Sequence, residues 1–245
     1  MRGRFVLLTL YRLQRGKGVI VVGRRQDRLD AFVKEHGEDK AKRVAFDIGN
    51  LDKIPEFAAE VMQQSPDIDS VFINAGTQTP LDLTKPFDLS GFHEEIKINF
   101  SSFVALTHAF LPYPQKKSDP TSFVYTGSLL SIVPGAWIPA YSASKAALNA
   151  FAMCLRDQLR HSTVKVIERS PPVVQTELHD WMGESGCSFG MPLAAFTERA
   201  YEGLAAGKDE VIVDSIGHAD VFNDIVDKRR AAFTDLAKML RGGEP

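Results

Sequence analysis

The sequence contains few cysteines and no excess of charge of one sign. Its two cysteines, Cys154 and Cys187, are too few to build a disulfide framework or a zinc site among 245 residues. The 29 basic and 31 acidic residues leave a net charge of −2, which does not support a large basic surface for nucleic acid. We therefore expect no bound metal, no nucleic-acid partner and a reducing compartment, where disulfides are rare.

Long hydrophobic runs are also missing. No stretch approaches the roughly 20 apolar residues that cross a bilayer. The apolar run at residues 5–10 is shorter than the hydrophobic region of a signal peptide, and no small-residue cleavage site follows it. These observations predict a cytoplasmic protein without a membrane partner.

Short runs rich in β-branched residues alternate with helical patterns along the chain. Strands are predicted at residues 19–22, 43–46, 70–73, 122–126, 164–167 and 211–213, and helices at 26–36, 50–62, 92–110, 141–159 and 221–240. This alternation is typical of a parallel sheet covered by helices on both faces. No linker or repeat divides the pattern, so residues 1–245 are expected to form a single α/β domain with a doubly wound, Rossmann-like sheet.

Polar side chains follow several of the predicted strands. Ligands of open α/β sheets bind at the carboxyl ends of the strands, and polar residues occur there at 74–76, 127–128 and 171–176. Beyond the second of these segments, Tyr141 precedes Lys145 by one helical turn. The two side chains share a helix face, and a lysine cation there favours the phenolate form of a tyrosine. Tyr141 is thus a candidate general acid or base, although an exposed helix face with a chance pair is the alternative.

The candidate pair belongs to a larger set of motifs. Ser128 precedes Tyr141 by 13 residues, Asn99 precedes Ser128 by 29, and Asn-Ala-Gly occupies residues 74–76. Over about residues 19–213 this combination resembles the short-chain dehydrogenase/reductase family. The resemblance implies an NAD(P)H-dependent oxidoreductase that interconverts a small-molecule carbonyl and a secondary alcohol by hydride transfer.

The resemblance also implies a role for each catalytic residue. Tyr141 would act as general acid or base, and Ser128 would hold the substrate oxygen by a hydrogen bond. Lys145 would bind the nicotinamide ribose, and Asn99 would hold a water that links Lys145 to solvent. Two alternatives stay open: Asn99 bonds the backbone at a helix irregularity, and Ser128 is a turn residue.

The same resemblance implies a cofactor site and a substrate lid. The cofactor-binding residues would be Asp47, Ile48, Asn74, Ala75, Gly76, Tyr141, Lys145, Pro171, Val174 and Thr176. Asp47 has an alternative as a capping aspartate, and Pro172 replaces the family's usual glycine. Residues 178–191 would form the lid, or else a packed surface loop, with pocket walls from Trp181, Met182 and Phe189.

The choice of cofactor depends on the residues after the strand at 19–22. An acidic residue there would bind the ribose 2′-hydroxyl of NAD, whereas arginine accommodates the 2′-phosphate of NADP. Arg24 and Arg25 occupy this place, which favours NADP over NAD, with ordinary exposed arginines as the alternative. The family resemblance further implies a homodimer or homotetramer that uses the helices at 92–110 and 141–159.

The start of the chain departs from the family pattern. Family members open with a strand and a Thr-Gly-xxx-Gly-x-Gly turn whose backbone amides bind the pyrophosphate. Counting back from Gly16 puts the last glycine of that turn near Phe5 and the middle one near Gly3, which predicts that the first strand is missing. The alternative function is therefore a catalytically impaired relative that acts as a binding or regulatory partner.

Overall fold

The computed structural model describes residues 18–116 and 118–242. The expectations about Gly3, Phe5 and a first strand lie outside the described residues. The strands are β1 (Val19–Gly23), β2 (Ala41–Ala45), β3 (Ser70–Ile73), β4 (Thr121–Thr126), β5 (Val164–Ser170) and β6 (Glu210–Ile212). The helices are α2 (Gln26–His36), α3 (Ile54–Gln64), α4 (Leu89–Ile96), α5 (Ser102–Phe110), α6 (Pro139–Gln158), α7 (Leu193–Ala205) and α8 (Ala219–Leu240). Short helical segments are η1 (Leu51–Lys53), η2 (Lys97–Ser101), η3 (Pro114–Lys116), η4 (Leu129–Ser131) and η5 (Glu177–Ser188).

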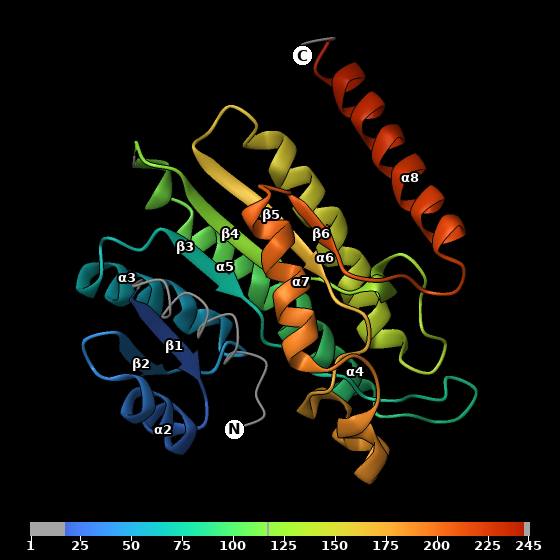
Figure 1. Ribbon diagram of the computed structural model, residues 1–245, viewed down its shortest axis with the longest axis horizontal. Coiled ribbons are helices and arrows are strands. Elements are labelled where there is room, and N and C mark those ends of the chain that lie inside the picture. The colour runs from blue at the N-terminus through green and yellow to red at the C-terminus, as the bar shows by residue number, and fades with distance from the viewer. Residues whose placement is uncertain (1–17, 117, 243–245) are drawn as a thin grey trace.

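The strands pair in parallel and form two groups. β1 pairs with β2, and β3, β4, β5 and β6 form a second sheet in that order. Within residues 18–116 and 118–242, no ladder joins β1 to β3, and the two groups lie side by side in Figure 1. The parallel strands with their helical connections confirm the predicted α/β, Rossmann-like fold class.

Helices cover both faces of the strands because alternate residues point to opposite faces. In β1, Val21 packs with Leu29 and Phe32 of α2, whereas Ile20 and Val22 pack toward the main core. That main core lies between β3–β5 and the helices α3, α5 and α6. α7 covers the opposite face near β6, and α8 extends away from the sheet (Figure 1).

The predicted helix at 92–110 is interrupted in the structure. α4 runs into the π-helical turn η2, which is followed by α5. Single π turns inside helices occur mostly at functional sites, and this one contains Asn99. No described helix is both long and apolar enough to span a membrane.

Candidate active site

α6 brings the predicted pair together at the carboxyl end of β4. Tyr141 and Lys145 are both buried, and the Lys145 Nζ lies 5.5 Å from the centre of the Tyr141 ring. The same ammonium donates a hydrogen bond of 2.8 Å to the Thr126 carbonyl oxygen, at the last residue of β4. The helix is thus tied through Lys145 to the strand end that leads to Ser128.

Ser128 lies two residues beyond β4, at the start of η4. It is buried, and its Oγ accepts a hydrogen bond of 3.2 Å from the backbone N–H of Leu130. Ser131 Oγ donates to the Ser128 carbonyl oxygen at 2.7 Å. Because α6 packs against η4, the turn faces the helix that carries Tyr141. Ser128 is therefore both a turn residue and a neighbour of the Tyr141 helix.

Asn99 is fully buried and bonds to the backbone of Thr77. Its Oδ1 accepts from the Thr77 N–H at 2.9 Å, and its Nδ2 donates to the Thr77 carbonyl at 2.8 Å. Asn99 lies in the π turn, so the alternative of a backbone bond at a helix irregularity describes the observed side-chain contacts. These bonds hold the loop that follows residues 74–76 against the helix.

One turn before Asn99, Glu95 contacts the same loop. Its side chain is 3% exposed, and burial raises the pKa of its carboxyl to about 7, opposed by hydrogen bonds from Thr79. Sequence reasoning missed this residue because nothing in the pattern distinguishes it from the exposed Glu94 beside it. An acid that is partly protonated near neutral pH therefore lies one turn from Asn99.

Asn74 lies at the end of β3 within a buried polar cluster. Its Oδ1 accepts hydrogen bonds from Thr126 Oγ1 at 2.6 Å and from Arg169 Nη2 at 2.5 Å. Arg169 also donates to Thr126 Oγ1 at 2.8 Å, so three strand ends are joined by one guanidinium. Ala75 and Gly76 follow and are half-buried. Sequence reasoning did not predict Arg169 or Thr126 at this place.

The segment after β5 carries the residues that the family resemblance predicts to line a nicotinamide site. Pro171, Val174 and Thr176 are buried, and Val174 forms a parallel bridge with Met191. Two buried polar atoms, Thr176 Oγ1 and Asn74 Nδ2, have no hydrogen-bond partner in the described part of the chain. Buried polar groups are normally hydrogen-bonded. These two atoms are therefore available to hydrogen-bond a polar ligand, such as a dinucleotide, at the carboxyl ends of β3 and β5.

The residues expected to bind the adenosine end of the cofactor make contacts with other residues of the protein. Asp47 accepts a hydrogen bond from the Gly49 N–H at 2.9 Å in the turn before η1, whose N-cap is Asn50, and Arg24 lies 3.8 Å from its other oxygen. Ile48 packs against the main core. The structure thus brings Arg24 and Asp47 together at the end of β1.

Arg25 pairs with a residue that sequence reasoning did not consider. Its Nη1 lies 2.9 Å from Glu177 Oε2, and Arg28 Nη1 lies 2.5 Å from Glu177 Oε1. Partial burial alone would raise the pKa of Glu177, but hydrogen bonds from Arg28 and Arg25 hold it below its ordinary value. The first turn of α2 is thereby linked to the start of η5, across the strand ends.

η5 occupies most of the predicted lid at 178–191. Trp181, Met182 and Phe189 are between 37% and 54% exposed. The Trp181 indole donates to Gln78 Oε1 at 3.2 Å, and His179 Nδ1 lies 3.2 Å from the same oxygen. The segment therefore lies over the loop after β3 and presents apolar side chains to solvent.

Comparisons with known proteins agree with this arrangement. A family model described as short chain dehydrogenase matches residues 8–184. The oxidoreductase DltE of Bacillus subtilis (strain 168) is 30% identical over 202 residues, which cover 81% of this chain and 79% of DltE. Benzil reductase IRC24 of Saccharomyces cerevisiae is 29% identical over 164 residues, 64% of this chain and 61% of the reductase. A short-chain dehydrogenase from Sphingobium yanoikuyae, solved with NADPH, has a TM-score of 0.82 at 18% identity and covers 96% of this chain and 92% of its own.

Proposed function

The chain belongs to the short-chain dehydrogenase family, and from that premise we propose that it interconverts a carbonyl group and a secondary alcohol with NADP as cofactor. The observation that carries the proposal is the single buried face of α6 with Tyr141 and Lys145, packed against the turn that begins at Ser128. Of the curated relatives named above, IRC24 is named a benzil reductase and DltE an uncharacterized oxidoreductase, and the first name supports turnover rather than binding alone.

In this proposal each residue transfers a proton, binds the substrate oxygen or contacts the cofactor. The cofactor supplies the hydride when it is bound. Tyr141 gives its phenolic proton to the carbonyl oxygen during reduction, and Ser128 Oγ donates a hydrogen bond to the same oxygen. Lys145 would bind the ribose of the cofactor, and Thr176 Oγ1 would contribute a polar contact at the nicotinamide end.

NADP is proposed over NAD because cations gather where the adenosine ribose would lie. Arg24, Arg25 and Arg28 follow β1, and all three are within ion-pair distance of an acidic side chain. Arginine binds phosphate oxygens through its planar fork of N–H groups. A 2′-phosphate would compete with Glu177 for Arg25, so its binding exchanges one anion for another.

An apolar carbonyl compound is the proposed substrate class. Trp181, Met182 and Phe189 of the lid segment and Trp137 before α6 are exposed aromatic or apolar side chains. Trp137 is linked to the loop after β3, since its carbonyl accepts from the Leu81 N–H at 2.8 Å. Clustered apolar side chains around a few polar groups are typical of small-molecule sites.

The test is NADPH oxidation with benzil as the aromatic probe. Wild-type protein should turn over, and Tyr141→Phe should lose about 100-fold or more in kcat because only the transferable proton is removed. Circular dichroism spectra and melting temperatures of the two proteins should agree, since the ring is kept. Equal rates for wild type and Tyr141→Phe would refute the role of Tyr141, and a wild type inert toward every carbonyl tested would refute the function.

A further inference from the structure

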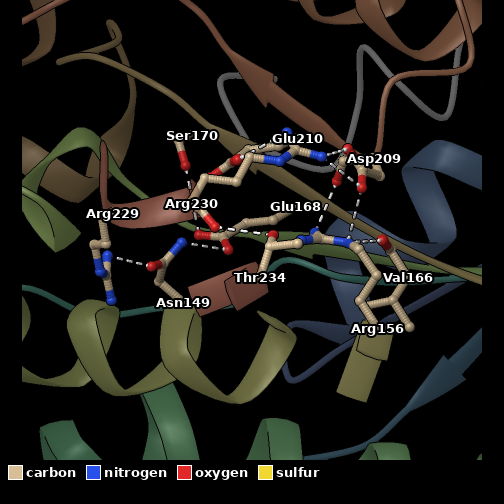
Figure 2. A network of polar contacts seen from close by, with 10 residues as sticks. All are labelled: Asn149, Arg156, Val166, Glu168, Ser170, Asp209, Glu210, Arg229, Arg230 and Thr234. Carbon is tan, nitrogen blue, oxygen red and sulfur yellow. Dashed lines mark hydrogen bonds and ion pairs between the residues drawn. The ribbon is translucent and has the colours of Figure 1, made fainter. Parts of the chain in front are cut away.

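A buried polar network lies between α6 and β5, one helical turn beyond Lys145, and has no part in the proposed function. Glu168 of β5 and Asn149 of α6 are 1% and 2% exposed. Asn149 Nδ2 donates to Glu168 Oε2 at 2.8 Å, and Arg229 Nη1 of α8 donates to Asn149 Oδ1 at 2.5 Å (Figure 2). Because the guanidinium can only donate, the Asn149 amide turns its own N–H groups toward Glu168.

The other carboxyl oxygen of Glu168 lies against Gly127. A Cβ atom at residue 127 would be 2.1 Å from Glu168 Oε1, closer than any van der Waals contact allows. Ser170 Oγ is at 3.5 Å from the same oxygen. Glu168 therefore touches the main chain between Thr126, which holds Lys145, and Ser128.

Tyr141, Lys145 and Asn149 lie on one face of α6 at a spacing of four residues. Each step along this face spans about 6 Å, since a helix rises about 1.5 Å per residue. Lys145 bonds the carbonyl of Thr126, and Asn149 bonds Glu168, which packs on the next residue, Gly127. Successive turns of the helix are thus held against successive residues of the strand end.

We propose that Glu168 is a positioning residue for the reaction, which keeps Tyr141 and Lys145 in register with Ser128. This inference rests on the proposed function of those residues. A side chain that only filled the space beside Gly127 would be apolar, because burial of a carboxyl is unfavourable and here raises its pKa to about 7. Glu168 supplies what an apolar side chain lacks: a hydrogen-bond acceptor for Asn149.

The charged groups around Glu168 come from three elements. Lys145 and Arg156 of α6 favour the ionised carboxylate, and Glu210 of β6 disfavours it. Arg229 of α8 acts through the Asn149 amide. Glutamine at 168 would keep the shape and the acceptor for Asn149 without ionising, and its amide nitrogen would donate to Ser170 Oγ where Glu168 Oε1 accepts from it.

Two substitutions separate positioning from space filling. Glu168→Met keeps a side chain of similar length and removes the acceptor, so kcat for benzil reduction should fall about 10- to 100-fold while KM changes by less than about twofold. Glu168→Gln should retain kcat within about threefold of wild type. Arg230→Gln is the matched control, because Arg230 follows Arg229 on α8 but pairs with Asp209 and Glu210 at the start of β6 instead of Asn149. Its kcat should equal that of wild type.

Amide hydrogen exchange without cofactor gives a reading that does not depend on catalysis. Glu168→Met should speed exchange at residues 126–131 and 145–149 and leave α3 unchanged, and Glu168→Gln should not. If wild type is active and Glu168→Met retains both its kcat and its local protection, the inference is wrong and the proposed function stands. If wild type is inactive, the proposed function fails, and unchanged local exchange in Glu168→Met would overturn the positioning role as well.

Discussion

Replacing Asn99 by alanine should destabilise the protein whatever its part in catalysis. The side chain is fully buried and makes two hydrogen bonds, at 2.8 and 2.9 Å, to the carbonyl and N–H of Thr77. A net hydrogen bond contributes about 1 kcal/mol, and leaving its partly buried partner unpaired costs up to about 1–3 kcal/mol. We expect Asn99→Ala to lower the free energy of unfolding by about 2–4 kcal/mol in total.

Thermal and urea unfolding followed by circular dichroism measure this loss. For a chain of this length, about 1 kcal/mol shifts the melting temperature by roughly 2–4 °C, so the expected fall is roughly 4–16 °C. Asn99→Asp should lose at least as much near neutral pH, because its second carboxylate oxygen would face the Thr77 carbonyl in place of a donor.

Thr77→Ala is the matched control, since both bonds from Asn99 go to the main chain of Thr77. It should melt close to wild type. A loss of less than about 1 kcal/mol in Asn99→Ala, or an equal loss in Thr77→Ala, would refute the reasoning.

Three further outcomes follow from single contacts. Gly127→Ala should cost about 1–3 kcal/mol from the clash with Glu168, and combining it with Glu168→Ala should cost less than the two separate losses added together, as urea midpoints would show. The pKa of Glu95 is raised to about 7 in the folded state, so the folded protein binds more protons, and stability should fall as pH rises from about 4.5 to 7. Glu95→Gln removes this fall, so its stability relative to wild type should be greater at pH 8 than at pH 5, and an equal difference at both would contradict the assignment. Glu177→Gln should change stability by at most about 1 kcal/mol, because its ion pairs are exposed to solvent.

Periodicity was enough to predict the elements that present one apolar face. The helix at residues 26–36 has its observed bounds because Leu29, Phe32 and Val33 form one stripe and Gly37 ends it with a φ of 85°. The Tyr141 and Lys145 pair was also predictable, since a spacing of four on a helix is a local property of the chain. These parts of the fold and the site depend on neighbours in the sequence.

What could not be predicted depends on residues distant in the sequence. β5 continues through Glu168 and Arg169 to Ser170, although two charged residues are not typical of a buried strand. Their partners include Asn149 of α6, which bonds Glu168, and Asn74 at the end of β3, which bonds Arg169. The pairing of Arg25 with the start of η5 likewise joins segments far apart in the chain. No short stretch of the sequence contains both residues of such a contact.

The π turn at Lys97–Ser101 makes this helix intolerant of insertions and deletions. An α-helix turns about 100° per residue, and a π turn holds an extra residue, so α5 is rotated relative to the direction that α4 alone would give it. Asn99 can therefore face the loop at Thr77 while Phe103 and Leu106 face the core. Loss of one residue within 97–101 would restore a regular helix at the expense of one of these two faces. A surface loop can accommodate a change of length. Here the same change would rotate either Asn99 away from Thr77 or Phe103 and Leu106 away from the core.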